Sequence, residues 1–334
     1  MKVVLERDVD PAGWNSLMAS DPDASFFHDP AWIQSLARVY PSFRPLYFLA
    51  RDDAGRLLGG LPAVRSSRAG LTQLLSLPFG SYGTPLVAPG SAAPAAQVRA
   101  ALLDRWFAEA RRPGVVRAHL TPFQAEVPNP VHLRFPPSWR RNERTHLIPL
   151  REGFEAIWFH RYDKENRTAS RKAVKLGVIV AREPGEPGAR ILEELYRRQH
   201  PEWTGHIPYR YGLFRSLVET CGDRVEVWVA RQADRPVFAV MTFYHRDTVM
   251  PWLSGNTADA RSLCAGNLIH KVMIEDAASR GFATYNFGGS GGVPGIEAFK
   301  VAFGGIPVDY PSYFKESPWF GRVRKLSHRF RRPG

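Results

Sequence analysis

The chain has 334 residues, of which 44% are hydrophobic and 23% are charged. This composition excludes a disordered chain, a coiled coil and a collagen-like fibre, and the length predicts two domains. The two cysteines, Cys221 and Cys264, are too few for a disulfide framework and lack metal-ligand spacing. The formal net charge of +13 favours polyanionic partners such as RNA, phosphorylated substrates or an anionic membrane surface.

No segment has the pattern of a membrane span or an export signal. The longest uncharged stretch, residues 69–98, contains prolines and glycines that prevent a continuous helix. The first residues, MKVVLERDVDPAGW, include no apolar core of signal-peptide length. We therefore expect a cytoplasmic protein.

The spacing of apolar residues predicts a mixed α/β first half. In chain order we expect a helix over 31–39 and a hairpin with strands over 44–51 and 56–65, turned at 52–55. A third strand over 71–77, a long helix over 93–112 and a fourth strand over 115–120 follow. Pro113 and Gly114 end the long helix.

The second half repeats this order after additional helices. We expect helices over 155–176, 189–200 and 209–221, hairpin strands over 225–231 and 237–244, a strand near 249–253, a helix over 263–280 and a strand over 283–287. Between the two hairpins, Leu49-Ala50-Arg51 aligns with Val229-Ala230-Arg231. We predict an α/β (α+β) fold of two similar units, with domains at 1–148 and 149–316 and a basic helix over 317–334.

A glycine-rich loop follows the last expected strand. Residues 288–292 have the form G-x-S-x-G around Ser290, which is the pattern of the nucleophile elbow of α/β-hydrolases. An elbow needs a helix directly after the serine, and Pro294-Gly295 argues against one. We therefore interpret Ser290 as part of a flexible loop beside a binding groove.

Lys300 follows this loop, flanked by Phe299 and Phe303, and Phe303 is a candidate substrate-binding residue. A lysine in such a partly dry place can hold a phosphate or a developing oxyanion. The alternative is a surface lysine with only its stem buried.

A second group of cations lies on the helix expected near 161–182. Lys164, Arg167, Arg171 and Lys175 recur at i+3 and i+4 spacing and form one positive face. The single sign of this face favours phosphate contact, and the alternative is a solvated surface.

The loop at 200–211 is dense in aromatic, histidine and arginine residues, and it forms either a pocket wall or core packing. Tyr209 and Arg210 are candidate substrate-binding residues, since arginine matches carboxylate or phosphate. His206 is a weak candidate for a general base.

The C-terminal tail is basic and amphipathic. Ser317-Pro318 has the pattern of a helix start, and Trp319 begins an apolar face bordered by arginines. Such a helix is typical of peripheral binding to an anionic membrane or of RNA contact, and the alternative is docking on the domain.

Six segments, in this order, resemble the FemAB-like branch of the GNAT superfamily. They are Ser25-Phe26-Phe27-His28 with Trp32, Gly59-Gly60-Leu61-Pro62, 76–83 (SLPFGSYG), 164–173 (KENRTASRKA), Tyr285-Asn286-Phe287-Gly288 and 299–304 (FKVAFG). The resemblance covers residues 20–314 and implies two tandem acyltransferase-like domains, with no metal and no bound cofactor.

The resemblance also implies transfer of an acyl or aminoacyl group to an amine acceptor, for which family members use a peptidoglycan precursor such as lipid II. The donor would be aminoacyl-tRNA or acyl-CoA as co-substrate. Lys300 matches the family lysine at the transfer centre, Tyr82 matches a tyrosine lining the acceptor groove, and Arg167 lies in the cationic segment opening the second domain. We expect Lys300 to stabilise the oxyanion with help from the backbone amides of 288–292, and Tyr82, Arg167 and Arg210 to hold anionic groups of the acceptor.

Three departures keep the function open. No carboxylate follows Pro85, where Leu86-Val87-Ala88 is apolar, and a helical arm linked with tRNA in some members is absent. The pyrophosphate loop Q/R-x-x-G-x-G/A of coenzyme A-dependent relatives is not intact at 261–266. An aminoacyl-tRNA-dependent transferase is the leading hypothesis. The alternatives are an acyl-CoA N-acyltransferase and a non-catalytic protein that binds RNA or a membrane.

Overall fold

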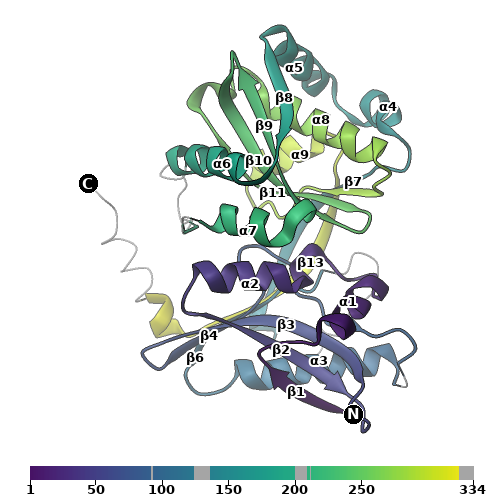
Figure 1. The fold of residues 1–334 in the computed structure, drawn as a ribbon, viewed down its shortest axis with the longest axis vertical. Helices are drawn as coiled ribbons and strands as arrows, with labels where there is room; N and C mark the ends of the chain where they lie inside the picture. The colour runs from purple at the N-terminus through teal and green to yellow at the C-terminus, as the bar shows by residue number, and fades with distance from the viewer. Residues whose placement is uncertain (92, 124–135, 200–208, 211, 323–334) are drawn as a thin grey trace. The chain divides into compact units, whose positions relative to one another are not determined.

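Two groups of strands and helices can be followed in the ribbon of Figure 1. The computed structural model describes residues 1–91, 93–123, 136–199, 209–210 and 212–322. One unit contains Met1–Ile33, Tyr40–Asn142 and the described residues from Tyr310 onward, and the other contains Gln34–Val39 and Glu143–Asp309.

The sheet of the first unit has the strand order β1-β2-β3-β4-β6-β13. Its strands are β1 (Lys2–Glu6), β2 (Phe43–Arg51), β3 (Leu57–Arg68), β4 (Leu71–Ser76), β6 (Val115–Leu120) and the end of β13 (Ile306–Glu316), and β5 (Leu86–Val87) pairs with β3. Strands β4 and β6 are parallel, and the other pairs are antiparallel.

Helices pack on both faces of this sheet because its strands alternate apolar side chains between the two faces. Phe48 and Ala50 face the long helix α3 (Ala95–Ala110), which buries Trp106. On the other face, Trp14 of α1 (Pro11–Ser20) packs edge-on against Tyr47, with ring centroids 5.1 Å apart. The helix α2 (Pro30–Val39) follows the 3-10 turn Phe26–His28.

The second sheet has the order β7-β12-β11-β10-β9-β8. Its strands are β7 (Arg140–Pro149), β8 (Val178–Glu183), β9 (Val225–Gln232), β10 (Arg235–His245), β11 (Thr248–Asn256) and β12 (Thr284–Asn286). One face carries α5 (Lys164–Lys175) and α8 (Ala265–Ser279), and the other carries α6 (Gly185–Gln199) and α7 (Leu213–Cys221). The remaining segments are α4 (Phe154–Ala156), the π-helical Ile157–Arg161, α9 (Pro294–Val301) and 3-10 turns at Pro137–Trp139, Gly222–Arg224 and Ala258–Ala260.

The predicted repetition is confirmed by the strand order. The series β1-β2-β3-β4-β6 in the first unit matches β8-β9-β10-β11-β12 in the second, and a parallel pair stands in the same place in each, β4 with β6 and β11 with β12. Beyond that pair, each sheet gains a strand from a distant part of the chain, β13 beside β6 and β7 beside β12. The α/β fold class with two sheet-and-helix units is therefore as predicted.

These added strands explain why the division differs from the expected domains at 1–148, 149–316 and 317–334. Strand β7 starts at Arg140, and its residues from 143 onward belong to the second unit, where Ile148 pairs with Tyr285. Residues from Tyr310 onward belong to the first unit, because Tyr313 pairs with Leu120. Residues 318–322 are helical, and the rest of the expected terminal helix lies outside the described residues.

Two expectations about helices were wrong. The single helix over 155–176 is interrupted, because Tyr162 is extended and Asp163 caps a new helix, accepting a hydrogen bond from the Asn166 backbone N–H at 2.9 Å. A helix does form after the glycine-rich loop, where Pro294 occupies its first turn and needs no N–H partner.

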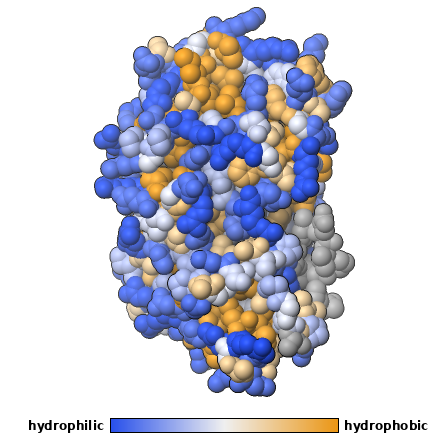
Figure 2. Space-filling model, turned by 45° about the vertical axis from the view of Figure 1, so that its right-hand side comes forward, coloured by the Kyte–Doolittle hydropathy of each residue, from blue (hydrophilic) through white to orange (hydrophobic). Residues whose placement is uncertain are grey.

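The exposed large apolar residues gather partly around α9. Hydrophilic residues cover most of the face in Figure 2, and hydrophobic residues form smaller orange areas. Four exposed apolar side chains lie on or beside α9: Val293, Ile296, Val301 and Ile306. Within the described ranges, no helix is both long enough and apolar enough to span a bilayer.

Candidate active site

The loop Gly288–Gly292 and the lysine of α9 form one cluster in the second unit. Strand β12 ends at Asn286, the loop follows, and Lys300 in the last turn of α9 reaches back to it. The Lys300 ammonium contacts the Gly288 carbonyl at 2.7 Å, the Gly289 carbonyl at 3.0 Å and Ser290 Oγ at 3.0 Å. Its three N–H donors therefore all have acceptors inside the protein.

This environment changes the acid–base chemistry of Lys300. Its side chain is buried, with 5% of the residue exposed. Burial lowers the pKa of Lys300 to about 8, and the nearby carboxylate of Glu297 only partly opposes this effect. A lysine with this pKa is present in both protonation states near neutral pH, which suits a proton-transfer role.

The charged groups around Lys300 come from several elements. Burial and the charge of Lys300 both lower the pKa of His146 on β7, whose buried Nδ1 has no hydrogen-bond partner among the described residues. Arg144 Nε donates to Asp309 at 2.6 Å, and its guanidinium lies 3.7 Å from Glu297. Burial, followed by the charge of Lys300, lowers the pKa of His270 to about 3, so this imidazole is neutral.

Buried polar and aromatic groups hold the cluster in place. Asn286 Oδ1 accepts hydrogen bonds from the Gly288 N–H at 2.9 Å and from Thr145 Oγ1 at 2.7 Å. Below Lys300, Phe303 is fully buried against Tyr162 and Phe299, with ring centroids 5.1 and 5.0 Å away. Phe303 is therefore a core residue that supports the site, although its sequence position suggested substrate contact.

The cationic helix α5 starts beside this cluster. The Asp163 backbone N–H and Asn166 Nδ2 both donate to the carbonyl of Ala302, two residues beyond Lys300, at 3.1 and 3.0 Å. Asn166 also accepts a hydrogen bond from Asn267 of α8 at 2.8 Å. These asparagines were missed by sequence analysis, because nothing in the linear pattern shows that they join three helices.

Only three of the four cations in the predicted positive face are exposed to solvent. Arg167 turns inward and donates to the carbonyls of Tyr162 and Trp158, the latter at 3.2 Å, so it holds the end of the π-helical turn. Lys164, Arg171 and Lys175 are exposed, and Arg171 lies 5.7 Å from the Trp158 ring centroid.

Tyr209 and Arg210 also lie in the second unit. Tyr209 stacks on Tyr196 of α6 and packs against Trp252 of β11, with ring centroids 5.7 and 5.1 Å away. Arg210 is exposed. His206, the weak candidate for a base, lies outside the described residues.

Tyr82 lies in the first unit and is buried, with 2% of the residue exposed. Its ring stacks on Phe123 at 4.4 Å and meets Phe27 and Tyr310 edge-on. The loop carrying Tyr82 is therefore held by aromatic packing.

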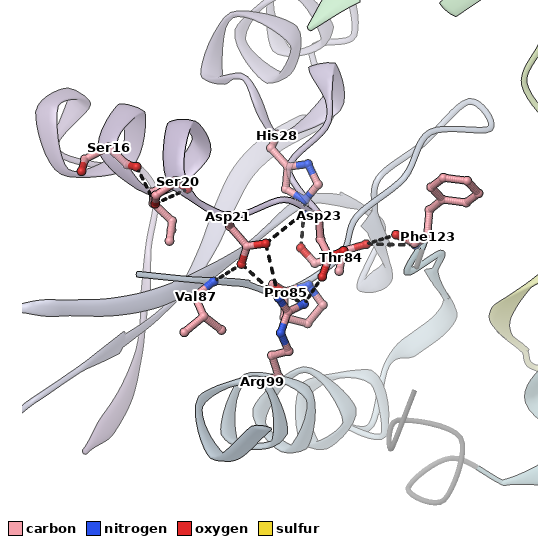
Figure 3. A network of polar contacts seen from close by, with 11 residues as sticks. Ser16, Ser20, Asp21, Asp23, His28, Thr84, Pro85, Val87, Arg99 and Phe123 are labelled. Carbon is pink, nitrogen blue, oxygen red and sulfur yellow. Dashed lines mark hydrogen bonds and ion pairs between the residues drawn. The ribbon is translucent and has the colours of Figure 1, made fainter. Parts of the chain in front are cut away.

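Figure 3 shows a polar network beside this loop. His28 Nε2 lies 2.8 Å from the Thr84 carbonyl, and the Asp21 carboxylate accepts hydrogen bonds from the Val87 N–H at 2.6 Å and from Arg99 at 3.0 Å. A carboxylate thus stands next to the apolar 86–88 segment, although it comes from a distant part of the sequence. Its pairing with Arg99 indicates a structural role.

The segment at 261–266 contains one residue in a backbone conformation that favours glycine. In Arg261-Ser-Leu-Cys-Ala-Gly266, cysteine replaces the first glycine of the R-x-x-G-x-G pattern. Cys264 has φ 54° and ψ 29°, the left-handed conformation that glycine adopts without strain. The backbone there opens α8 as a glycine would.

We expect Cys264→Gly to change the free energy of unfolding by less than about 1 kcal/mol, because the lost side-chain contacts and the relieved strain offset each other. Cys264→Val should destabilise the protein by about 2 kcal/mol, since a β-branched residue tolerates this conformation poorly. Denaturant unfolding of both variants measures the difference. Equal stabilities would contradict the assigned backbone conformation.

Comparison with known families gives one match, which lies within the second unit. Residues 160–301 match the family model of the acetyltransferase (GNAT) domain, a range that includes α5, the glycine-rich loop and Lys300. Over these residues the chain is similar to GNAT acetyltransferases. No curated protein sequence matches it significantly.

Solved structures extend this likeness in fold to the whole chain. FemX has a TM-score of 0.68 and 12% identity, with 97% of this chain and 100% of FemX covered. A tandem GNAT protein from the clavulanic acid biosynthesis pathway has a TM-score of 0.58 and 13% identity, covering 94% and 98% of the two chains. L-PGS from Bacillus licheniformis has a TM-score of 0.56 and 11% identity, covering 96% of each chain. The predicted α/β fold of two similar sheet-and-helix units is thereby confirmed.

Proposed function

We propose that this chain transfers an aminoacyl group from aminoacyl-tRNA to an amine acceptor, a peptidoglycan precursor being the acceptor that the FemAB-like resemblance suggests. The reaction would take place at the Lys300 cluster of the GNAT domain, without a metal or bound cofactor. The FemX-like fold supports acyl transfer, and the charge of α5 supports the choice of donor.

The observation that carries this donor is the unneutralised charge of α5. Its exposed Lys164, Arg171, Lys172 and Lys175 form no ion pair with any described residue. Elsewhere many arginines are paired, as Arg182 is with Asp276 and Arg235 with Asp259. A free cationic face whose first turn is hydrogen-bonded to Ala302 would lead a polyanionic donor to the transfer centre.

The contacts of Lys300 refine its proposed role. Because its N–H donors are occupied by the loop, Lys300 would hold the loop in shape, and the developing oxyanion would be stabilised by backbone amides. The N–H groups of Gly291 and Gly292 donate to no acceptor among the described residues. Fixed donors of this kind stabilise an oxyanion most strongly when water is excluded from the site.

A coenzyme A donor is the second candidate, and the left-handed Cys264 is the observation that favours it. A helix N-terminus with this loop shape presents free backbone N–H groups to a pyrophosphate. The family model that matches is also that of acetyltransferases.

Titration with aminoacyl-tRNA and, separately, with acetyl-CoA at two salt concentrations distinguishes the donors. We expect micromolar, salt-sensitive binding of aminoacyl-tRNA and no saturable binding of acetyl-CoA. The double variant Lys164→Glu/Lys175→Glu should weaken tRNA binding at least tenfold and reduce the salt slope by roughly 0.7 for each lost phosphate contact.

The matched control is Lys2→Glu/Arg7→Glu, which makes the same charge change at exposed positions of the first unit. Equal weakening by both double variants would show that net charge alone drives tRNA binding. Saturable acetyl-CoA binding with weak, unselective RNA binding would replace the proposal by the acyl-CoA alternative.

Peripheral contact with an anionic membrane through residues 317–334 remains part of the proposal, because a lipid-linked acceptor would require it. The likeness in fold to a putative lysylphosphatidylglycerol synthetase supports an acceptor of this kind. Sedimentation with phosphatidylglycerol vesicles, with and without residues 323–334, would test it.

A further inference from the structure

An open cavity of about 290 Å³ lies in the first unit, at the end of the sheet where β3 turns into β4. Strands β3, β4 and β6 supply one side of it, and Phe320 of the helical residues 318–322 supplies the other. In Figure 1 this short helix is the yellow segment beside β4 and β6. The volume is close to that of the smallest small-molecule sites, about 300 Å³.

The strand register places the sheet part of this lining on one face. Ser66 is opposite Gln73, and Arg68 is opposite Leu71. Directly opposite residues of an antiparallel pair, and residues two apart in one strand, point to the same side of a sheet. The four side chains therefore share one surface, with a cation and an apolar side chain nearest the turn and two polar side chains further along the strands.

Two polar side chains of this surface are not used by the fold. The Gln73 amide is half-buried and the Arg68 guanidinium is exposed, and neither side chain forms a hydrogen bond or an ion pair with any described residue. By contrast, Ser66 Oγ donates to Ser42 Oγ at 3.2 Å. An arginine without a partner keeps its fork of N–H donors for a phosphate or a carboxylate.

The rest of the lining is mainly apolar. Leu71 and Phe320 are partly exposed, and Val116 is buried. The Ser317 backbone N–H donates to the Val116 carbonyl at 2.8 Å, which fixes the start of the short helix to β6 and so holds Phe320 over the strands. A ligand that fits this cavity needs an apolar part and one anionic group.

The surface beside the cavity indicates the source of such a ligand. Trp319 is 51% exposed, and Arg322 is exposed and forms no ion pair with a described residue. The carboxylate of Glu316 lies beside Gly321, and Glu316 is opposite Arg117 in the register of β13 and β6. An exposed tryptophan together with arginines that no described acid neutralises is typical of a surface that meets anionic lipid.

We propose that this cavity binds the headgroup of one anionic phospholipid. The phosphate would lie on Arg68, the glycerol oxygens on Gln73, and the start of the acyl chains against Leu71 and Phe320. This inference deepens the peripheral membrane contact of the proposed function and rests on that part of it. The first unit would then recognise a lipid molecule as well as the charge of the membrane surface.

Titration calorimetry with dihexanoyl-phosphatidylglycerol, kept below its micelle concentration, tests the cavity without a membrane surface. We expect saturable binding to one site of the full chain. Dihexanoyl-phosphatidylcholine, whose headgroup has no net charge, and inorganic phosphate, which has no apolar part, should each bind at least about tenfold more weakly. Inorganic phosphate that binds as tightly as the lipid would identify a free-phosphate site and overturn the proposal.

Arg68→Gln should weaken binding of the short-chain lipid at least about tenfold, because the charge-assisted hydrogen bonds to its phosphate are lost. The matched control is Arg65→Gln, which makes the same change at an exposed position of the same strand, on the opposite face of the sheet. Equal weakening by the two variants, or no saturable binding to the wild type, would refute the site.

The apolar wall has its own test. Phe320→Ala should weaken binding of the short-chain lipid at least about fivefold, because apolar contact with the acyl chains is lost. Phe320→Leu, which keeps an apolar side chain, should restore most of the affinity. If Phe320→Ala binds the lipid as the wild type does, the proposed placement of the acyl chains is wrong.

Sedimentation with phosphatidylglycerol vesicles distinguishes the failure of this inference from the failure of the proposed membrane contact. If the protein sediments with vesicles but does not bind the short-chain lipid, the cavity is refuted and the membrane contact stands. If the short-chain lipid binds with the expected dependence on Arg68 but vesicles do not, the lipid site stands and the membrane contact is refuted.

Discussion

Lys300→Met is expected to lower the rate of acyl transfer by a hundredfold or more while the protein stays folded. Methionine fills a similar volume but provides no donor for the Gly288 and Gly289 carbonyls or for Ser290 Oγ. Losing a base or a positioned donor costs about 10²-fold or more in rate. Single-turnover transfer and denaturant unfolding of the same preparation measure both effects.

The stability of this variant has a distinctive pH dependence. Burial lowers the pKa of Lys300 from 10.5 to about 8, so holding it charged costs the folded state roughly 3 kcal/mol below pH 8. Between pH 8 and 10.5 the unfolded chain binds a proton that the folded chain lacks, so wild-type stability rises through this range relative to Lys300→Met. At pH 7 we expect the variant to be as stable as the wild type or more stable, because methionine places no charge in this buried position.

Lys315 provides a matched control in the first unit. Its ammonium donates to the carbonyls of Ala110 and Val115 at 2.7 and 3.0 Å, and to no hydroxyl of the described residues. Lys315→Met should lower stability modestly and leave transfer intact. If both methionine variants lost transfer equally, the assignment of the centre to Lys300 would be wrong.

Gly304→Ala is expected to produce the largest loss of stability, about 3 kcal/mol or more. Gly304 has φ +80°, and an added Cβ would lie 2.3 Å from Arg161 Cβ and 3.0 Å from the Arg161 carbonyl carbon. The strain of a left-handed alanine therefore adds to a contact with backbone that cannot move aside easily. Because Gly304 joins the Lys300 turn to the π-helical segment, transfer should fall as well.

Gly295→Ala is the control for this prediction. Gly295 lies in the first turn of α9, and an added Cβ would meet no atom within 4 Å. Alanine should raise stability by about 0.5 kcal/mol, because it lowers the entropy of the unfolded chain. Urea titrations of both variants measure the free energy of unfolding. A decrease of less than about 1 kcal/mol for Gly304→Ala would refute the close approach to Arg161.

The element order was predictable because local periodicity determines it. The hairpins, the long helix α3 and the helix α8 all follow from apolar spacing and from turn residues such as Gly55 and Gly281. The strand exchange was not predictable in this way. Strands β7 and β13 are each specified by pairing with strands far away in sequence, as Tyr313 is with Leu120.

The site shows the same limit. Lys300 and the glycine-rich loop could be selected from the sequence, because their residue types and proximity suggest chemistry. The direction of a side chain could not, so Arg167 turns to backbone carbonyls, Phe303 enters the core and Tyr82 is buried among aromatic rings. The role of Asn166 and Asn267 could not be predicted from the sequence, because their side chains act by forming hydrogen bonds between α5, α8 and the end of α9.

The most direct test of the account is transfer itself, measured with aminoacyl-tRNA carrying a labelled amino acid and a soluble amine-bearing peptidoglycan stem peptide. The account predicts a labelled amide product that disappears when the tRNA is first treated with ribonuclease and that falls at least a hundredfold with Lys300→Met. Product formed from acyl-CoA alone would contradict the donor, and wild-type rates from Lys300→Met would contradict the transfer centre.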